Sequence, residues 1–136
     1  MNHLLDVNVL VAWGWSDHVD HARTVRWIAE RKDNRNARLF TSPISEIGFV
    51  RVSIHRVSGR ITVHQAAKVL SSLRHSLGAA HRFLPDDVDG IDWPDWCTSA
   101  PRTTDAHLLA LAERHNIHLA TLDAGIPGAY LLPQKT

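Results

Sequence analysis

The sequence predicts an α/β fold in which helices cover both faces of a mostly parallel sheet. Five short apolar runs have the length of strands, and helical segments separate most of them. These runs are continuously apolar rather than alternating, as in a sheet that is buried on both faces. The strands are expected at 3–7, 37–42, 81–85, 118–122 and 129–133.

The helices between these strands carry recognisable start signals. Asn8 is the expected N-cap of the first helix. Ser42 is the expected cap of the third helix, and Pro43 fills its first position. Thr62 and Gln65 stand at capping-box spacing before the fourth. The helices are expected at 9–14, 17–32, 43–58, 62–78 and 103–115, and the polar stretch 86–102 is expected to be a loop.

Length and composition favour one soluble globular domain over residues 1–136. The chain is 44% hydrophobic and 21% charged, and it has no uninterrupted apolar run of the roughly 18 residues that a membrane span needs. Asp6 interrupts the apolar N-terminus, which argues against a signal peptide. Cys97 is the only cysteine, so no intrachain disulfide can form. We therefore expect a cytoplasmic protein without a membrane partner.

Four acidic residues occupy equivalent places in these elements. Asp6 ends the first expected strand, and Asp123 ends the strand after 103–115. Glu46 and Asp105 lie in the first turns of the helices that begin at 43 and 103. Strand carboxyl ends and the following helix N-termini meet at one edge of a parallel sheet, where ligands bind. All four carboxylates are therefore expected at that edge.

Such a group of carboxylates suits a hard divalent cation. Close carboxylates repel one another, and Mg²⁺ or Mn²⁺ removes the repulsion through oxygen ligands. A metal held in this way activates water and stabilises charge on a phosphoryl group. The helix N-termini would add positive partial charge at the same edge. Phosphodiester hydrolysis is the chemistry that this arrangement suits best.

Each acid also has an ordinary structural explanation. Glu46 and Asp105 could simply satisfy helix dipoles, and Asp123 could belong to a turn. Asp6 is harder to explain, because a carboxylate directly after a buried strand is costly unless it is paired or bound. The coincidence of four acids at one edge carries the prediction, rather than any one of them.

The order of motifs resembles that of the PIN domain. The stretches "LLDVNVLVA", "SPISEIGFVR" and "TTDAHLLALAERHNIHLATLD" follow one another in a chain of this length. Together they are most similar to the small VapC-type toxins of bacterial toxin–antitoxin pairs. The resemblance covers nearly the whole chain.

This resemblance implies a three-layer α/β/α sandwich and a Mg²⁺- or Mn²⁺-dependent ribonuclease. It assigns the metal and the catalysis to the family's four acids, which here are Asp6, Glu46, Asp105 and Asp123. Thr121, two residues before the last acid, matches a position where the family often has Ser or Thr. Asn8 stands where many members have Thr or Ser, and its amide can still bind a carboxylate or a metal-bound water. The resemblance also implies RNA as substrate, a cognate antitoxin and a homodimer.

Several other side chains could contact the substrate. Arg102 precedes the helix of Asp105, and it is the basic residue we expect to contact an RNA phosphate or the antitoxin. Arg51, Arg56 and Arg60 lie along or just after the helix of Glu46.

Four of the five tryptophans fall into two groups. Trp13 and Trp27 are expected in the core or at a dimer interface, because large aromatic side chains are usually buried. Trp93 and Trp96 lie in the polar loop, where they could pack on the core or stack on unpaired bases.

Two alternatives to a nuclease remain open. A phosphatase of the haloacid-dehalogenase or receiver type also has an Asp after its first strand, but it needs a late Lys. Lys32, Lys68 and Lys135 stand in no matching place. The other alternative is a catalytically inactive PIN-like module that binds RNA or protein. Such a module would usually have lost one or more acids, and all four are present here.

Overall fold

The structure is a computed structural model that describes residues 1–134, so Lys135 and the end of the predicted domain 1–136 lie outside it. The strands are β1 (His3–Leu5), β2 (Leu39–Thr41), β3 (His81–Phe83), β4 (His118–Thr121) and β5 (Tyr130–Leu131). The helices are α1 (Val7–Gly14), α2 (His21–Lys32), α3 (Pro43–Arg56), α4 (Val63–Leu77) and α5 (Thr103–Arg114), with 3₁₀ turns η1 (Gly78–Ala80) and η2 (Ala100–Arg102).

The five strands form one parallel sheet in the order β3-β2-β1-β4-β5. From β1 the chain passes outward to β2 and β3, and then it returns to the other side of β1 through α5 and β4. The strand order therefore reverses between β1 and β4. This junction is where ligands bind in open parallel sheets.

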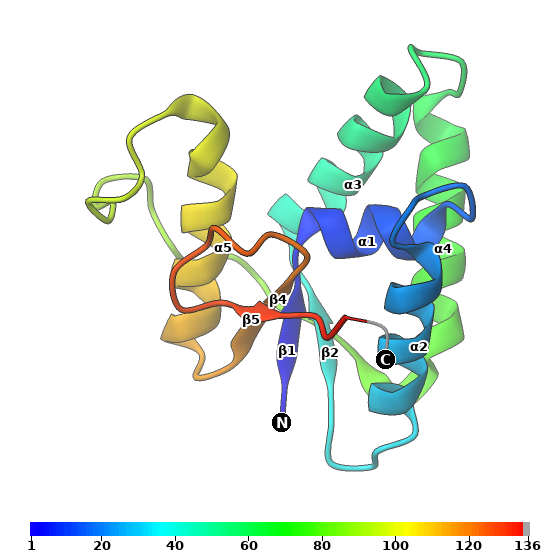
Figure 1. Cartoon of the computed structure of the whole chain (residues 1–136), viewed down its shortest axis with the longest axis horizontal. Helices are drawn as coiled ribbons and strands as arrows, with labels where there is room; N and C mark the ends of the chain where they lie inside the picture. The colour runs from blue at the N-terminus through cyan, green and yellow to red at the C-terminus, as the bar shows by residue number, and fades with distance from the viewer. Residues whose placement is uncertain (135–136) are drawn as a thin grey trace.

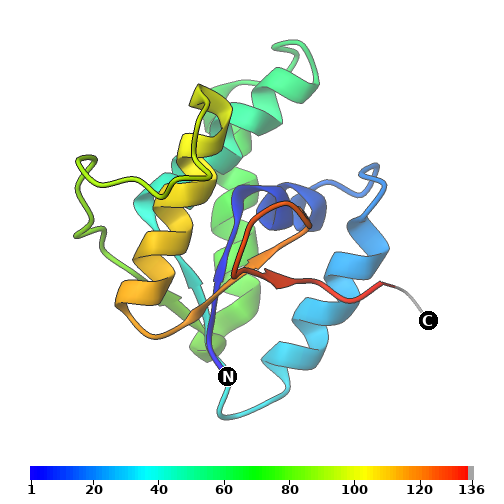
Figure 2. The same cartoon turned by 60° about the vertical axis from the view of Figure 1, so that its left-hand side comes forward.

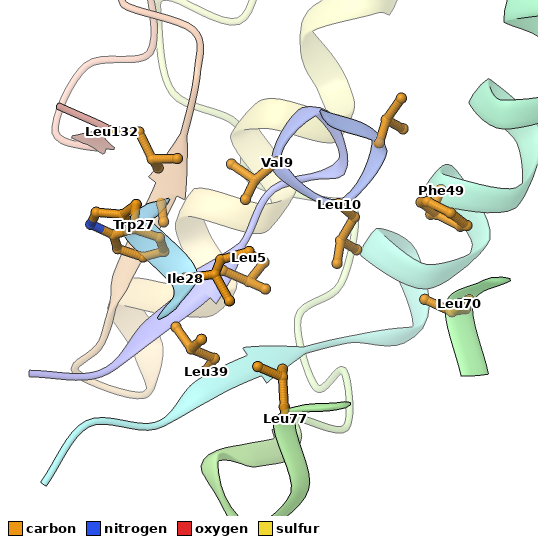
Figure 3. Close-up of a cluster of buried hydrophobic side chains, with 12 residues drawn as sticks. Leu5, Val9, Leu10, Trp27, Ile28, Leu39, Phe49, Leu70, Leu77 and Leu132 are labelled. Atoms are coloured by element: carbon orange, nitrogen blue, oxygen red, sulfur yellow. The ribbon is translucent and has the colours of Figure 1, made fainter. Parts of the chain in front are cut away.

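Helices cover both faces of the sheet, which confirms the three-layer α/β/α arrangement (Figure 1). On one face Leu5 and Leu39 pack with residues of α1, α2, α3 and α4, and Figure 3 shows this cluster extending from Trp27 to Phe49. On the opposite face Leu4 and Leu119 pack against α5, which stands by itself to the left of the strands in Figure 1 and is seen from another side in Figure 2. The side chains of neighbouring strand residues, such as Leu4 and Leu5, thus point to opposite faces of the sheet and pack in different helical layers.

The first helix begins earlier than the sequence predicts. The expected N-cap was Asn8, but α1 starts at Val7 and Asp6 is its cap, with Oδ1 of Asp6 accepting a 2.7 Å hydrogen bond from the Val7 amide. Asn8 lies in the first turn because its side chain is used elsewhere: Oδ1 accepts a 3.1 Å hydrogen bond from the Leu122 amide. A contact between distant segments has therefore overridden the local capping preference of Asn8.

The starts of α3 and α4 follow their capping signals closely. Ser42 and Thr62 both form capping boxes, and Pro43 occupies the first position of α3. The partner of Ser42 is Ser45 rather than Glu46, which leaves the Glu46 carboxylate free for other contacts. The second helix begins at His21 instead of 17, because hydrogen-bonded turns occupy the residues before it.

Within residues 1–134, no helix is both long and apolar enough to cross a membrane.

Candidate active site

Two acids follow the neighbouring strands β1 and β4 at the point where the strand order reverses. Asp6 comes directly after β1 and caps α1, so it is held between a strand end and a helix start. Asp123 lies two residues after β4, and its Oδ1 accepts a 2.8 Å hydrogen bond from the Gly125 amide. The register pairs Leu5 with Ala120 across the two strands. The topology thus brings these two carboxylates to one edge.

The Asp6 carboxylate is buried and fixed at both oxygens. Only 2% of the residue is exposed. Oδ1 accepts the hydrogen bond from the Val7 amide, and Oδ2 accepts a 2.7 Å hydrogen bond from the hydroxyl of Thr121. Among residues 1–134 no Lys, Arg or His pairs with this carboxylate. Asp6 is therefore a buried anion without a protein cation beside it.

Thr121 connects Asp6 with the two other polar residues of this edge. Its hydroxyl donates to Asp6, and it accepts hydrogen bonds of 3.1 Å from Nδ2 of Asn8 and 3.0 Å from the Asp123 amide. Because the hydroxyl proton is committed to Asp6, the Asn8 amide nitrogen and the backbone of Asp123 both act as donors to Thr121. The network holds Asp6 in one orientation.

Asp105 lies in the first turn of α5, close to Arg102. Its Oδ2 is 3.9 Å from Nε of Arg102, and the Asp105 side chain is 22% exposed. Burial and the nearby charge of Asp123 raise the pKa of Asp105, and the Arg102 guanidinium opposes the rise. Asp105 and Asp123 are therefore close enough to repel one another, as the sequence predicts for this edge.

The same repulsion extends to Asp6. Burial raises the pKa of Asp6 from an ordinary 3.8 to about 6, the charges of Asp105 and Asp123 add to the rise, and the hydrogen bonds from Thr121 and Val7 oppose it. Hydrogen-bond donors that stabilise the charged form are thus outweighed by burial and like charge. Three carboxylates that repel one another, one of them buried and unpaired, suit a divalent cation. Within residues 1–134, however, no three His, Cys, Asp or Glu side chains lie close enough together to hold an ion without moving.

Glu46 points to a different set of partners. Its Oε2 accepts a 2.6 Å hydrogen bond from the Thr41 hydroxyl and lies 3.1 Å from Nη1 of Arg74 on α4. Thr41 in turn lies 2.7 Å from Nε2 of His81. Glu46 does not contribute to the pKa shift of Asp6 or Asp105. The structure therefore joins Asp6, Asp105 and Asp123, and it holds Glu46 against Arg74.

Arg74 is the residue of this site that sequence reasoning missed. An arginine in the last turn of a helix is explained by the helix dipole alone, and nothing in the local sequence indicates that α4 presents it to Glu46. Only the packing of α4 against α3 reveals the pair.

A pocket of about 280 Å³ opens over Asp6 and Asp105. Its walls come from the start of α1, the middle of α3 and the junction of η2 with α5. The lining residues are Asp6, Val7, Asn8, Arg51, Val52, Pro101, Thr104 and Asp105. Two of the expected acids and the expected Asn8 thus border one hollow.

Arg102 lies at the edge of the sheet where the acids gather, but its guanidinium already contacts other protein groups. Nη2 donates a 2.7 Å hydrogen bond to the Gly125 carbonyl, and the group lies 4.9 Å from the ring centre of Trp96. Trp96 itself is partly buried against the hydrophobic cluster to which α5 contributes. Trp93 is 41% exposed, so its ring remains open to solvent. Arg102 therefore ties the loop of Trp96 to the segment after Asp123.

Trp13 and Trp27 agree with the expectation of a structural role. Trp27 is 3% exposed in the core, and Trp13 packs partly buried against the same cluster.

Comparisons with known proteins identify the family. Residues 3–130 match the PIN domain. Over 130 residues the chain is 39% identical to Ribonuclease VapC39 of Mycobacterium tuberculosis, covering 93% of this chain and 91% of the relative. Over 126 residues it is 42% identical to Ribonuclease VapC38 of the same organism, covering 90% of this chain and 86% of the relative.

Solved structures support the same fold. Mycobacterium tuberculosis VapC20, described as a sarcin-ricin loop cleaving toxin, has a TM-score of 0.61 at 13% identity, covering 96% of this chain and 99% of that one. VapBC2 of Rickettsia felis, bound to a DNA fragment from its promoter, has a TM-score of 0.57 at 14% identity, covering 96% and 97%. The phosphatase alternative has no support in these similarities. The chain belongs to the PIN-domain family and, within it, to the VapC ribonucleases.

Proposed function

We propose that this VapC ribonuclease is a Mg²⁺- or Mn²⁺-dependent endonuclease whose cation is held by Asp6, Asp105 and Asp123, with Glu46 as a fourth ligand. VapC nucleases with a PIN domain are generally metal-dependent. The observation that carries the proposal is the state of Asp6, a buried carboxylate with a raised pKa, two acidic neighbours and no cationic partner.

The donor set consists entirely of oxygen atoms, which Mg²⁺ and Mn²⁺ prefer. When bound, such a cation supplies a water of lowered pKa and stabilises negative charge on the phosphoryl group. The chain's own residues prepare the site. Thr121 fixes the Asp6 carboxylate, and Asn8 fixes Thr121 and the Leu122 backbone. Arg102 holds the Gly125 carbonyl and so restrains the segment that follows Asp123.

Glu46 must leave Arg74 to join the other acids. Its side chain is 15% exposed and that of Arg74 is 40% exposed. An ion pair this close to solvent is worth at most about 1 kcal/mol. A divalent cation can therefore compete with Arg74 for Glu46. This competition is the reason we keep Glu46 in the proposed ligand set.

The proposed substrate is RNA, and the proposed partners are a cognate antitoxin and a second copy of the chain. The curated relatives are named ribonucleases, and one solved neighbour is a VapBC pair. A hollow of about 880 Å³ between α3 and α4 offers a protein partner an apolar surface, with Ile47 and Val63 61% and 58% exposed. Glu46 borders this hollow, so a partner seated there would lie beside the proposed metal ligands.

Cleavage of a structured RNA with Mg²⁺, with Mn²⁺ and with EDTA tests the proposed reaction. We expect cleavage with either ion and none with EDTA, and we expect Asp6→Asn to lose at least 100-fold in rate, as when a group that fixes the reacting charge is removed. Cleavage that survives EDTA or Asp6→Asn would refute the mechanism.

The inactive binding module is the second candidate, and thermal unfolding separates it from the nuclease. Binding of Mn²⁺ to the folded state must raise the melting temperature through linkage. RNA binding without any Mn²⁺ shift would favour the module.

A further inference from the structure

Arg51 of α3 borders the pocket that contains Asp6 and Asp105. It faces the pocket from α3, whereas Thr104 and Asp105 face it from the start of α5. The residue is exposed, and within residues 1–134 its guanidinium makes no hydrogen bond or ion pair. A cationic side chain therefore stands unpaired at the rim of an acidic pocket.

The other arginines near this edge are already engaged. Arg102 binds the Gly125 carbonyl and faces Asp105, and Arg74 binds Glu46. Arg56, one turn further along α3, pairs with Asp17. Each of these guanidinium groups would have to give up a protein contact before it could bind a ligand.

Arg51 also has no ionic contact with the carboxylates of this pocket, Asp6 and Asp105. Arg102, and not Arg51, is the cation that acts on Asp105, and no arginine acts on Asp6. Arg51 therefore leaves the carboxylates free for a metal ion, while it stays on the wall of the same pocket. A cation at this place has an anionic ligand as its natural partner.

The phosphate backbone of RNA is such an anion, and its binding at this site requires a nearby positive charge. Carboxylates repel the phosphate backbone, so a strand that lies over Asp6 and Asp105 needs positive charge beside them in addition to the metal. An arginine meets this need well, because its planar guanidinium binds two phosphate oxygens at once.

We propose that Arg51, rather than Arg102, is the side chain that binds the RNA backbone at this pocket. The inference rests on the proposed function, because it takes RNA to be the ligand of the pocket. In this role Arg51 is a substrate-binding residue that sets where the strand lies over the carboxylates.

The test compares Arg51→Gln and Arg51→Lys with Arg26→Gln. Arg26 of α2 is a matched control, because it is exposed, makes no ion pair or hydrogen bond within the described part of the chain and lines none of the pockets described here. Each glutamine variant removes one positive charge. Binding of a fluorescein-labelled RNA oligonucleotide to the full-length protein is measured by anisotropy in EDTA at several salt concentrations, and cleavage of the same RNA is measured in Mn²⁺.

We expect Arg51→Gln to weaken RNA binding about tenfold at low salt, which is the loss of one charge-assisted contact. The slope of log affinity against log salt should become shallower by about 0.7, which corresponds to one phosphate contact fewer on a single strand. Arg51→Lys should keep the slope, and Arg26→Gln should match the wild type. Equal melting temperatures for the variants would show that α3 is intact.

Two results would overturn the inference in distinguishable ways. If the wild type cleaves RNA and Arg51→Gln binds and cleaves like Arg26→Gln, the role of Arg51 is refuted and the proposed function stands. If the wild type neither binds this RNA in EDTA nor cleaves it in Mn²⁺, the proposed function fails, and the inference fails with it.

Discussion

The hydroxyl of Thr121 donates a 2.7 Å hydrogen bond to Oδ2 of Asp6, although 115 positions separate the two residues. The bond crosses from the end of β4 to the start of α1, at the place where the strand order reverses. The same hydroxyl also accepts a hydrogen bond from the Asp123 amide. Thr121 therefore connects Asp6 and Asp123, which follow two different strands, within one site.

Removal of this hydroxyl should weaken both the fold and the site. In Thr121→Val the buried Asp6 carboxylate loses a donor, which should cost about 1–3 kcal/mol of unfolding free energy. Affinity for Mn²⁺ should fall roughly 10-fold or more, as for other residues that orient metal ligands. Urea unfolding and Mn²⁺ titration measure the two effects.

Thr24 provides the control for this substitution. It is also buried, but its hydroxyl has no hydrogen-bond partner within the described residues. Thr24→Val should therefore leave stability unchanged or raise it slightly. Equal losses in both variants would mean that Thr121 matters only as a buried threonine.

The charge on Asp6 should make the metal-free protein less stable as the pH rises. Its pKa is raised from 3.8 to about 6 in the folded protein, so the native state holds the proton more tightly than the unfolded state does. This contribution is fully present below about pH 4 and is lost as the pH passes about 6. Asp6→Asn keeps the helix cap and carries no charge. In EDTA at about pH 8, we expect this variant to be more stable than the wild type by up to about 3 kcal/mol.

The effect of Asp6 can be separated from a general effect of charge removal. The hydrogen bond from Arg56 lowers the pKa of exposed Asp17, so Asp17→Asn should give no gain at the same pH. Addition of Mn²⁺ should stabilise the wild type and leave Asp6→Asn nearly unchanged. A variant that is less stable than the wild type at every pH would contradict the idea that Asp6 is an unpaired buried anion.

Arg74 should compete with the metal ion for Glu46. In Arg74→Met the carboxylate of Glu46 loses its cationic partner, and Mn²⁺ affinity should rise up to about fivefold, which corresponds to an ion pair of about 1 kcal/mol. Isothermal titration calorimetry measures this change. Arg74→Lys should stay near the wild type, and the gain should vanish in the double variant Glu46→Gln/Arg74→Met. An unchanged affinity in Arg74→Met would remove Glu46 from the proposed ligands.

Arg102 should act on the structure of the site more than on RNA binding. In Arg102→Met the Gly125 carbonyl and the Trp96 ring both lose their contact with the guanidinium. We expect a loss of about 1–2 kcal/mol in stability and faster amide hydrogen exchange around Gly125. The salt dependence of RNA binding should not change. A shallower salt slope would instead support the RNA contact that the sequence suggests for Arg102.

Much of the fold could be predicted from the sequence because its signals are local. The capping residues Ser42 and Thr62 mark helix starts, and the buried strands are short continuous apolar runs. The prediction that Asn8 caps the first helix was wrong because its side chain binds Leu122, a residue that only the folded sheet brings near. Strand bounds were predicted one to two residues too long at several ends, since apolar residues that flank a strand also face the core.

The candidate site could be predicted only in part, because sequence position indicates the edge on which a side chain lies but not its partners. Asp6, Asp105 and Asp123 do influence one another. The pairing of Glu46 with Arg74 depends on how α4 packs on α3. The stacking of Arg102 on Trp96 depends on the course of an irregular loop.

The position of bound Mn²⁺ tests the central claim most directly. A crystal of the protein grown with Mn²⁺ would show the ion as an anomalous scattering peak. The account predicts the peak among the carboxylates of Asp6, Asp105 and Asp123, within about 2.0–2.3 Å of at least one of their oxygens. No peak at this edge, or a peak bound only by other residues, would contradict it.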